Sequence, residues 1–371
     1  MVLLRGDKDV GTVCGLQIRS VAKCGSLSFA GLTKCSTGWC NARANEGERH
    51  REMRSEVEKT VIRLNSGSKL PVLGFGTADF PFDRLKVEFA IRTALQLGYR
   101  HFDTAMIYGS EPAVGGALME AIRSETVSRE DVFVTSKLWG CHHHDPVSGL
   151  KQTLKNLGME YVDLYLIHWP AKLKEWANYV MPKEEDFGEL EMESTWAGME
   201  RCLDMGLCRS IGVSNFSCRK IERLMEHASL LPAVNQVEMH PMWRQKKLRE
   251  FCGEHNIHVS AYSPLGGPGS PWGTKAVVDN PIIRSIASKH KATPAQVALS
   301  WGLSKGVSLI MKSFNEERMK ENMGALEVKL EKEDVLKIDK LEERKIMRGE
   351  FLVNASTSPY KTIQDLWDDE I

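Results

Sequence analysis

Short apolar runs alternate with amphipathic stretches along most of this chain. The apolar runs are rich in β-forming residues, and they end near Phe75, Phe102, Leu138, His168, Val213, Val237, Ala261 and Met311. Between the first two, apolar residues recur at helical spacing from Val87 to Leu95, and Gly98 follows as a helix stop. Eight strands that alternate with helices predict a parallel sheet closed into a (β/α)8 barrel.

An open, doubly wound parallel sheet is the alternative that this alternation allows. Two observations count against it, because the strand-like runs match the barrel in number and none leads into a Gly-x-Gly-x-x-Gly motif. Ahead of the first barrel strand, residues 61–70 predict a β-hairpin. Thr293-Pro294 predicts a helix start, since threonine is a good cap and proline fits the first helical position.

Residues 1–58 differ in composition from residues 59–371, which we predict to be one barrel domain. Residues 11–45 contain no Asp or Glu but hold four cysteines. An acid-poor start with serine and arginine is typical of an organelle transit peptide, although Asp7 and Asp9 weaken this interpretation. The alternatives are a disordered extension, or translation from a start upstream of a usual one at Met53.

Composition excludes several classes of protein. The 371 residues have a formal net charge of +0, which gives no electrostatic case for nucleic acid or an anionic membrane surface. No apolar run approaches the ~20 residues that a spanning helix needs. The cysteines lack zinc-ligand spacing, which favours reduced thiols in a cytosolic-type compartment.

One cluster of metal-ligand residue types occurs, at Cys141-His142-His143-His144. Adjacent residues rarely converge on one ion, and no matching second cluster is evident. We therefore predict no metal site, and we interpret this segment as a solvated loop that borders a pocket.

Four candidate catalytic residues follow three of the predicted strands. Asp103 ends one strand, Tyr108 lies on the loop five residues later, Lys137 ends the next strand and His168 ends a third. The carboxyl ends of barrel strands share one face, so we expect the four side chains to meet in one cleft. Taken singly, such an aspartate usually caps a helix, and a lone tyrosine or histidine usually packs in a core. Their joint placement carries the prediction.

Together these residue types suit the reduction of a carbonyl group. A buried lysine beside a tyrosine favours the phenolate, so Lys137, held by Asp103, is expected to lower the pKa of Tyr108. Tyr108 can then give a proton to the carbonyl oxygen as a hydride reaches the carbon. His168 can bond the same oxygen and stabilise its developing charge.

A candidate anion site opens the helix after the eighth strand. Backbone N–H groups at a helix start, with Lys312, Ser313 and Arg318 beside them, can bind a phosphate. Without further context, a capped and charged surface helix is the more common explanation.

These motifs, taken together, resemble those of a known family. They are Gly74-Phe-Gly-Thr77, Gly98-Tyr-Arg-His-Phe-Asp-Thr-Ala105, Thr135-Ser-Lys-Leu-Trp139, Tyr161-Val-Asp-Leu-Tyr-Leu-Ile-His-Trp-Pro170 and Gly212-Val-Ser-Asn-Phe216. The chain resembles an aldo-keto reductase from about Val61 to its C-terminus. It is most similar to the plant group of chalcone reductase-like, codeinone reductase-like and deoxymugineic acid synthase-like enzymes. The resemblance implies that the hairpin plugs the barrel bottom and that a C-terminal loop shapes the substrate pocket.

NADPH is the cofactor that the resemblance implies. Lys312, Ser313 and Arg318 would hold its 2′-phosphate, and Glu321 and Asn322 would approach the adenine. The other implied cofactor contacts lie at strand ends, at Gly76, Thr77, Asp103, Ser214, Asn215, Gln236, Tyr262, Ser263 and Leu265. Met311 stands where relatives commonly have proline, a change that removes no phosphate contact.

The substrate pocket is implied by the same resemblance. Trp139, His168 and Trp169 would bind the substrate. The residues that would close the pocket are Phe80, Trp272 and the segment from Glu350 to Ile371, with Phe351, Tyr360 and Trp367.

We therefore expect an NADPH-dependent reductase of aldehydes or ketones, acting on plant secondary metabolites or toxic carbonyls. The alternatives are a polyketide-type reductase that works with a partner synthase, and a non-catalytic NADPH-binding protein. A small-molecule carbonyl is the expected partner, with no nucleic acid or membrane, and the chain is expected to be a monomer. The expected compartment is the cytoplasm, or a plastid if residues 1–58 act as a transit peptide.

Overall fold

The computed structural model describes residues 60–371, and in it eight parallel strands form a closed barrel. Their order around the barrel is β10-β3-β4-β5-β6-β7-β8-β9. The strands are β3 (Leu73–Gly76), β4 (His101–Asp103), β5 (Phe133–Leu138), β6 (Leu164–Ile167), β7 (Ile211–Ser214), β8 (Val234–Glu238), β9 (His258–Tyr262) and β10 (Ser308–Met311). Because β10 pairs with both β9 and β3, the predicted (β/α)8 barrel is confirmed and the open sheet is excluded.

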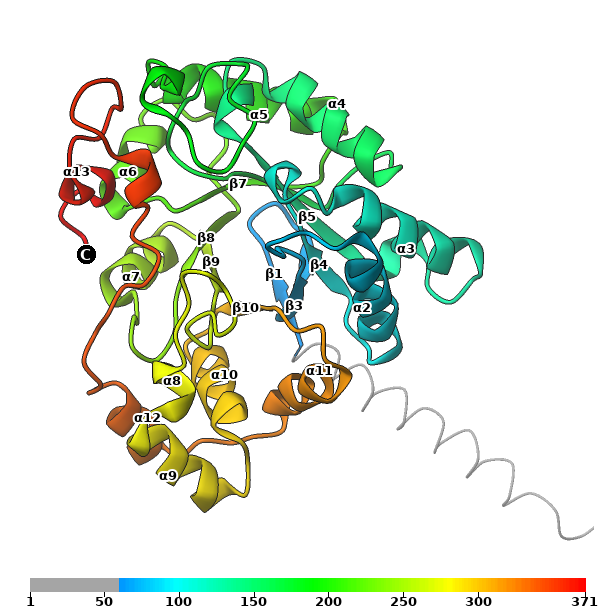
Figure 1. Ribbon diagram of the computed structural model, residues 1–371, viewed down its shortest axis with the longest axis vertical. Helices are drawn as coiled ribbons and strands as arrows, with labels where there is room; N and C mark the ends of the chain where they lie inside the picture. Colours follow the sequence, from blue (N-terminus) through cyan, green and yellow to red (C-terminus); the bar gives the residue numbers. More distant parts are fainter. Residues whose placement is uncertain (1–59) are drawn as a thin grey trace, which may run out of the picture. The chain divides into compact units, whose positions relative to one another are not determined.

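Helices surround the strands (Figure 1). They are α2 (Arg84–Gln96), α3 (Glu111–Arg123), α4 (Pro146–Leu157), α5 (Met192–Asp204), α6 (Cys218–Met225), α7 (Lys246–Glu254), α8 (Ala276–Asp279), α9 (Pro281–His290), α10 (Pro294–Ser304), α11 (Glu316–Met323), α12 (Lys332–Ile338) and α13 (Ile363–Trp367). The apolar face predicted from Val87 to Leu95 is buried on α2. At α10, the Thr293 hydroxyl accepts from the Gln296 backbone N–H, and the Gln296 side chain accepts from the Thr293 N–H.

The predicted hairpin closes one end of the barrel. Strands β1 (Val61–Arg63) and β2 (Lys69–Pro71) pair in antiparallel fashion. Leu64 and Leu70 pack in one apolar cluster with Phe133 and Leu164, which are the first residues of β5 and β6. The hairpin therefore seals the amino ends of the strands, and the carboxyl ends are left for function.

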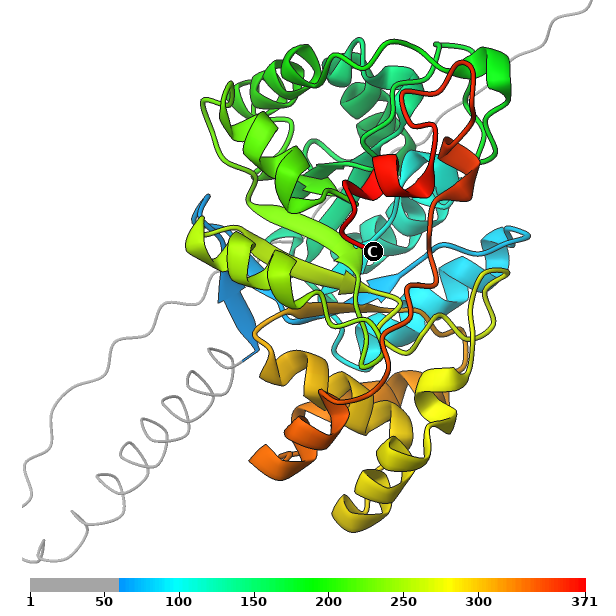
Figure 2. The same ribbon diagram turned by 90° about the vertical axis from the view of Figure 1, so that its left-hand side faces the viewer.

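The C-terminal segment, residues 344–371, packs against the carboxyl end of the barrel. It includes the short helix η6 (Glu350–Leu352) and α13, drawn in orange and red in Figure 2. Its apolar side chains form a separate cluster with Trp139 and Trp169, which follow β5 and β6. This segment thus reaches the end of the barrel where the candidate residues lie.

The described part of the chain has two further features that bear on function. Within residues 60–371, no helix is both long and apolar enough to cross a membrane. The five cysteines of this part are buried free thiols, at Cys141, Cys202, Cys208, Cys218 and Cys252. The predicted extension of residues 1–58 lies outside the described residues, so the domain boundary and the choice between cytoplasm and plastid stay predictions.

Gly115 on α3 lies against the backbone of Leu157 on α4. A Cβ added there would lie 1.9 Å from the carbonyl oxygen of Leu157, a backbone atom that cannot rotate away. We expect Gly115→Ala to lower the free energy of unfolding by about 2–3 kcal/mol, measured by urea denaturation. Gly116→Ala is the matched control, because its nearest atom is Glu88 Oε1 at 3.8 Å. The free energy of unfolding of the control should rise by up to about 1 kcal/mol, because alanine favours a helix more than glycine does. Equal stability of the two variants would contradict this packing.

Candidate active site

Two neighbouring strands bring a buried ion pair to the carboxyl end of the barrel. Asp103 is the last residue of β4, and Lys137 lies near the end of β5. The Lys137 Nζ donates to Asp103 Oδ1 at 2.5 Å and to the Thr104 carbonyl at 2.9 Å. The other Asp103 oxygen, Oδ2, accepts from Gln236 Nε2 at 2.8 Å. Both members of the pair are buried, and their fixed partners hold them in one geometry.

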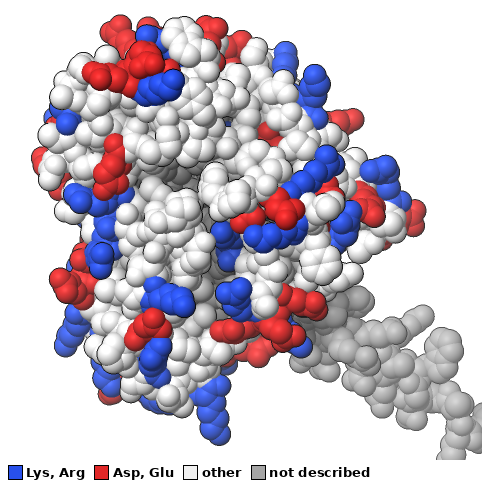
Figure 3. All heavy atoms as spheres, viewed as in Figure 1, with Lys and Arg blue, Asp and Glu red and all other residues white. Residues whose placement is uncertain are grey.

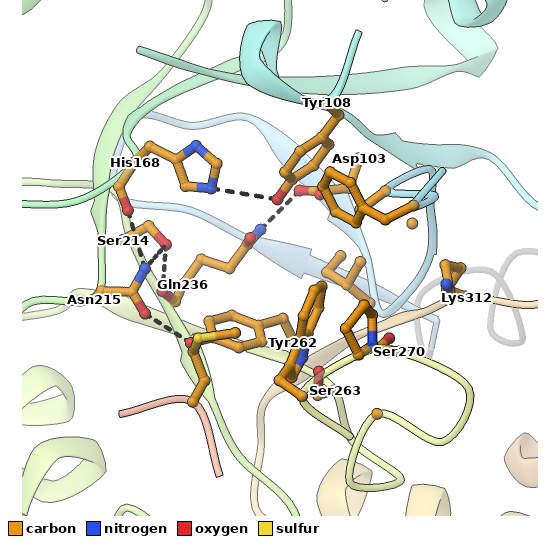
Figure 4. A pocket seen from close by; sticks show the side chains of 18 of the residues that line it. Asp103, Tyr108, His168, Ser214, Asn215, Gln236, Tyr262, Ser263, Ser270 and Lys312 are labelled. Carbon is orange, nitrogen blue, oxygen red and sulfur yellow. Dashed lines mark hydrogen bonds between the residues drawn. The ribbon is translucent and has the colours of Figure 1, made fainter. Parts of the chain in front are cut away.

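Tyr108 and His168 lie side by side in the pocket, with Asp103 next to Tyr108 (Figure 4). The Tyr108 hydroxyl is 3.3 Å from His168 Nε2, and the Lys137 Nζ is 5.1 Å from the centre of the Tyr108 ring. Tyr108 ends the short helix η1 (Met106–Tyr108), and His168 directly follows β6. The structure therefore brings all four predicted catalytic residues together.

Burial keeps both hydrogen-bonding groups neutral. It lowers the pKa of His168 well below its usual range, and the nearby Lys137 charge lowers it further. Burial, followed by the Asp103 carboxylate, raises the pKa of Tyr108 well above 10. The pKa of Tyr108 is therefore raised overall, and the expectation that it is lowered is wrong. The physical reason is that desolvation of the phenolate, together with the Asp103 charge, outweighs the attraction of the Lys137 ammonium, which lies 5.1 Å from the ring centre.

A cavity of about 470 Å³ opens beside Tyr108 and His168. It is lined by ten of the residues predicted to touch the cofactor, namely Gly76, Thr77, Asp103, Ser214, Asn215, Gln236, Tyr262, Ser263, Leu265 and Lys312. Lys137 does not line it, because this side chain is covered by Asp103 and Tyr108.

The polar groups at one end of this cavity already bond to one another (Figure 4). Asn215 Nδ2 donates to the His168 carbonyl at 3.0 Å, and its Oδ1 accepts from the Tyr262 hydroxyl at 2.8 Å. The Ser214 hydroxyl donates to the Gln236 carbonyl at 2.8 Å. These bonds hold the Tyr262 ring in the cavity wall, where it offers a flat surface to a ligand.

A second cavity, of about 660 Å³, adjoins the first and shares Leu265, Pro268 and Lys312 with it. The remaining predicted phosphate and adenine contacts line it, at Ser313, Arg318, Glu321 and Asn322. It also contains Lys275, which the sequence analysis did not identify. Figure 3 shows Lys and Arg side chains beside the hollow in the centre of this face.

Unpaired cations distinguish this second cavity. Within residues 60–371, the side chains of Lys275, Lys312 and Arg318 form no hydrogen bond or ion pair. Two other cations that line it are already neutralised, Lys86 by Asp79 at 2.9 Å and Arg284 by Asp279 at 2.5 Å. Burial lowers the pKa of Lys312, and Lys86 lowers it further against the opposing effect of Asp79. A phosphate would supply the negative charge that these three cations lack.

The substrate side of the first cavity is apolar and aromatic. The predicted residues Trp139, Trp169, Phe80, Trp272 and Phe351 line it, as do the unpredicted Val180, Met181, Ile346 and Met347. Tyr360 and Trp367 do not line it, which corrects the expectation that they close the pocket. They lie behind the wall, where the Trp367 ring packs on Trp169 at 5.9 Å and the Tyr360 hydroxyl donates to the Pro170 carbonyl.

The segment from Cys141 to Asp145 also differs from its prediction. It forms a short helix, η3 (Gly140–His142), with Cys141 and His143 buried, and it lines neither cavity. The expected position beside the pocket is therefore wrong, and of the three histidines His144 is exposed while His143 is buried. Thr195 on α5 donates to the His143 carbonyl at 3.1 Å, which ties the segment to that helix. Within residues 60–371, no group of three or more His, Cys, Asp or Glu residues is arranged to hold a metal ion.

Comparison with known proteins agrees with this geometry. The model of the aldo/keto reductase family matches residues 72–343, well over half of the chain. The chain belongs to this family. Membership supports an oxidoreductase that acts on small-molecule carbonyl compounds with a nicotinamide cofactor.

Curated relatives of this aldo/keto reductase include plant enzymes, as the sequence resemblance implied. It is 45% identical over 305 residues to "(1S)-1,7-diacetoxy-luvungin A aldo-keto reductase" of Citrus sinensis, an alignment covering 81% of this chain and 95% of that one. It is 46% identical over 306 residues to "Deoxymugineic acid synthase 1" of Zea mays, covering 81% and 97%. Among solved structures, the aldose reductase from Schistosoma japonicum matches with a TM-score of 0.74 at 33% identity, covering 81% of this chain and 98% of that chain.

Proposed function

We propose that this aldo/keto reductase uses NADPH to reduce aldehydes or ketones to alcohols. One observation carries the proposal: the Tyr108 hydroxyl and His168 Nε2 lie 3.3 Å apart at the cavity wall, above the buried Lys137–Asp103 pair. A carbonyl oxygen in the cavity, within hydrogen-bond reach of both the hydroxyl and the imidazole, would meet one proton donor and one neutral polar partner. NADPH, when bound, supplies the hydride.

Tyr108 provides the proton in this proposal. Its raised pKa keeps the hydroxyl protonated at neutral pH, so the proton is available when negative charge develops on the carbonyl oxygen. As that proton leaves, the phenolate oxygen forms near the Lys137 ammonium, which stabilises it. Asp103 holds the ammonium in place, and neutral His168 orients the carbonyl oxygen.

The residues present fit a nicotinamide dinucleotide bound across both cavities. The Tyr262 ring and the neighbouring amides suit a nicotinamide at one end, and the unpaired cations suit phosphate at the other. Lys312, Ser313 and Arg318 would hold the 2′-phosphate, which favours NADPH over NADH. Glu321 and Asn322 would approach the adenine, although the Glu321 carboxylate already accepts from the Thr293 hydroxyl at 2.5 Å.

Removing the phosphate contacts should change cofactor preference. We expect the double variant Lys312→Met/Arg318→Met to raise the Kd for NADPH about 100-fold, because two charge-assisted hydrogen bonds are lost. The Kd for NADH should change less than about threefold, since NADH lacks that phosphate. Both constants are measured by titration of protein fluorescence.

Lys246→Met is the matched control for this experiment. It removes a lysine from α7 that is 78% exposed and lines neither cavity, so both Kd values should stay unchanged. Equal weakening of NADPH and NADH by the double variant would show that these side chains do not recognise the 2′-phosphate.

The substrate itself is proposed only as a class. The relatives named above act on a luvungin A derivative and in deoxymugineic acid synthesis, and the aromatic wall suits a plant metabolite carbonyl or a toxic aldehyde. NADPH oxidation by the purified chain against a panel of aldehydes, ketones and oxo acids tests this proposal. Tight NADPH binding without turnover would favour the two alternatives, a substrate delivered by a partner synthase or a non-catalytic binding protein.

A further inference from the structure

The C-terminal segment forms one wall of the substrate cavity. Ile346, Met347 and Phe351 of this segment line the cavity. The Phe351 ring packs edge-on against Trp169 at 5.3 Å, and Trp169 lines the same cavity. The shape available to a substrate therefore depends on whatever holds this segment against the barrel.

A buried carboxylate holds the beginning of the segment. Glu238, the last residue of β8, accepts from the backbone N–H of Ile346 at 2.8 Å and of Met347 at 2.7 Å. Its Oε1 also bonds His240 Nε2 at 2.9 Å. This anchor belongs to the barrel itself, so the near end of the wall is fixed.

A buried ion pair holds the far end of the segment. Lys220, in the first turn of α6, donates to Asp368 Oδ2 at 2.5 Å and to the Leu366 carbonyl at 2.8 Å. The cap residue of α6, Ser217, donates to the same Asp368 oxygen at 2.5 Å. The side chains of Lys220 and Asp368 are only 8% and 9% exposed, so water competes little with this pair.

A second tail carboxylate binds the same helix start at the surface. Glu370 accepts from the Cys218 backbone N–H at 2.8 Å and pairs with Lys247 at 3.0 Å. Lys247 is 76% exposed, so this pair is screened by solvent. The two pairs share one location but differ in burial, which makes Lys247 a control for Lys220.

Ring contacts connect the buried pair to the cavity. Lys220 donates to the backbone carbonyl of Leu366, the residue before Trp367. The Trp367 ring packs on Trp169 at 5.9 Å, and Trp367 Nε1 donates to the Arg348 carbonyl at 2.7 Å. Helix α13 spans only five residues, too few to be stable without such external contacts.

From this geometry we infer that the Lys220–Asp368 pair positions the Trp169–Phe351 wall and thereby sets the affinity for bulky carbonyl substrates. The inference rests on the proposed reductase function. Neither residue touches the substrate, so both are positioning residues. Loss of the pair loosens α13 and Trp367, and Trp169 then loses the support behind it. A small carbonyl compound that contacts mainly Tyr108 and His168 is insensitive to this wall.

Steady-state kinetics with two aldehydes of different size test the inference. The variants to compare with the original chain are Lys220→Met, Asp368→Asn and the double variant. Naphthaldehyde serves as the bulky substrate and propanal as the small one. In each single variant the KM for naphthaldehyde should rise about tenfold with little change in kcat, since one or two aromatic contacts weaken. For propanal, kcat/KM should stay within about twofold of the original chain.

Three further readouts separate positioning from a general loss of folding. The KM of the double variant for naphthaldehyde should be no higher than that of either single variant, because the two residues act as one unit. The Kd for NADPH should not change, and Lys247→Met should behave as the original chain with both aldehydes. Asp368→Asn keeps the size of the side chain, so it reports on the ion pair even if Lys220→Met unfolds.

If the variants change the KM for both aldehydes equally, or change neither while the original chain reduces both, this inference is overturned and the proposed reductase function stands. If the original chain reduces neither aldehyde, the proposed function fails and this inference fails with it.

Discussion

Replacing Tyr108 with phenylalanine is expected to lower the turnover of aldehydes and ketones by about 10³-fold or more. The hydroxyl bonded to His168 is the acid that we place beside the substrate oxygen, and phenylalanine removes only that oxygen. The measurement is NADPH oxidation with a saturating aldehyde. The Kd for NADPH should stay within about twofold, because the ring that lines the cavity remains.

Tyr161→Phe is the matched control for this variant. The Tyr161 ring lies between the guanidinium groups of Arg129 and Arg209, at 4.0 Å and 4.2 Å, and lines neither cavity. Its loss of a hydroxyl should leave turnover unchanged. If Tyr108→Phe keeps more than about a tenth of the activity, Tyr108 is not the proton donor, since general acid catalysis contributes far more than tenfold.

Lys137→Met is expected to reduce both stability and turnover. It leaves the Asp103 carboxylate buried without its ion partner, which should lower the free energy of unfolding by about 3–5 kcal/mol. Turnover should fall about 10²-fold or more, because no ammonium remains to stabilise the phenolate as Tyr108 gives up its proton. Urea denaturation and NADPH oxidation measure the two effects on the same preparation.

The double variant Lys137→Met/Asp103→Asn distinguishes these two roles. An asparagine is uncharged and can still accept from Gln236, so much of the lost stability should return. Turnover should remain low, because the ammonium is still absent. Recovery of turnover together with stability would show that Lys137 serves folding alone.

The sequence supported prediction of most of the barrel and of the candidate site. Strands of parallel barrels are buried on both faces, so their apolar runs stand out, and polar residues at their ends are informative. That is why Asp103, Lys137 and His168 could be placed at one end of the barrel from the sequence alone. The wall residues Val180 and Met347 could not be found in this way, because they come from long connections without regular periodicity.

Three expectations needed correction, and each depended on distances between remote residues. The pKa of Tyr108 is raised rather than lowered, because burial and then the nearby Asp103 charge disfavour the phenolate. His143 is buried, and its carbonyl accepts from Thr195, which is 52 residues away. Trp367 supports Trp169 from behind instead of facing the cavity.

The sequence by itself thus determined the family, the closed barrel and the identity of the residues at the strand ends. These follow from local periodicity and from motifs, which need no knowledge of the space between segments. The tertiary structure alone decided which charges neutralise one another, which cations stay unpaired, and how Lys220 and Asp368 hold the substrate wall. Desolvation and Coulomb interactions depend on burial and on distance in space, and separation along the chain specifies neither.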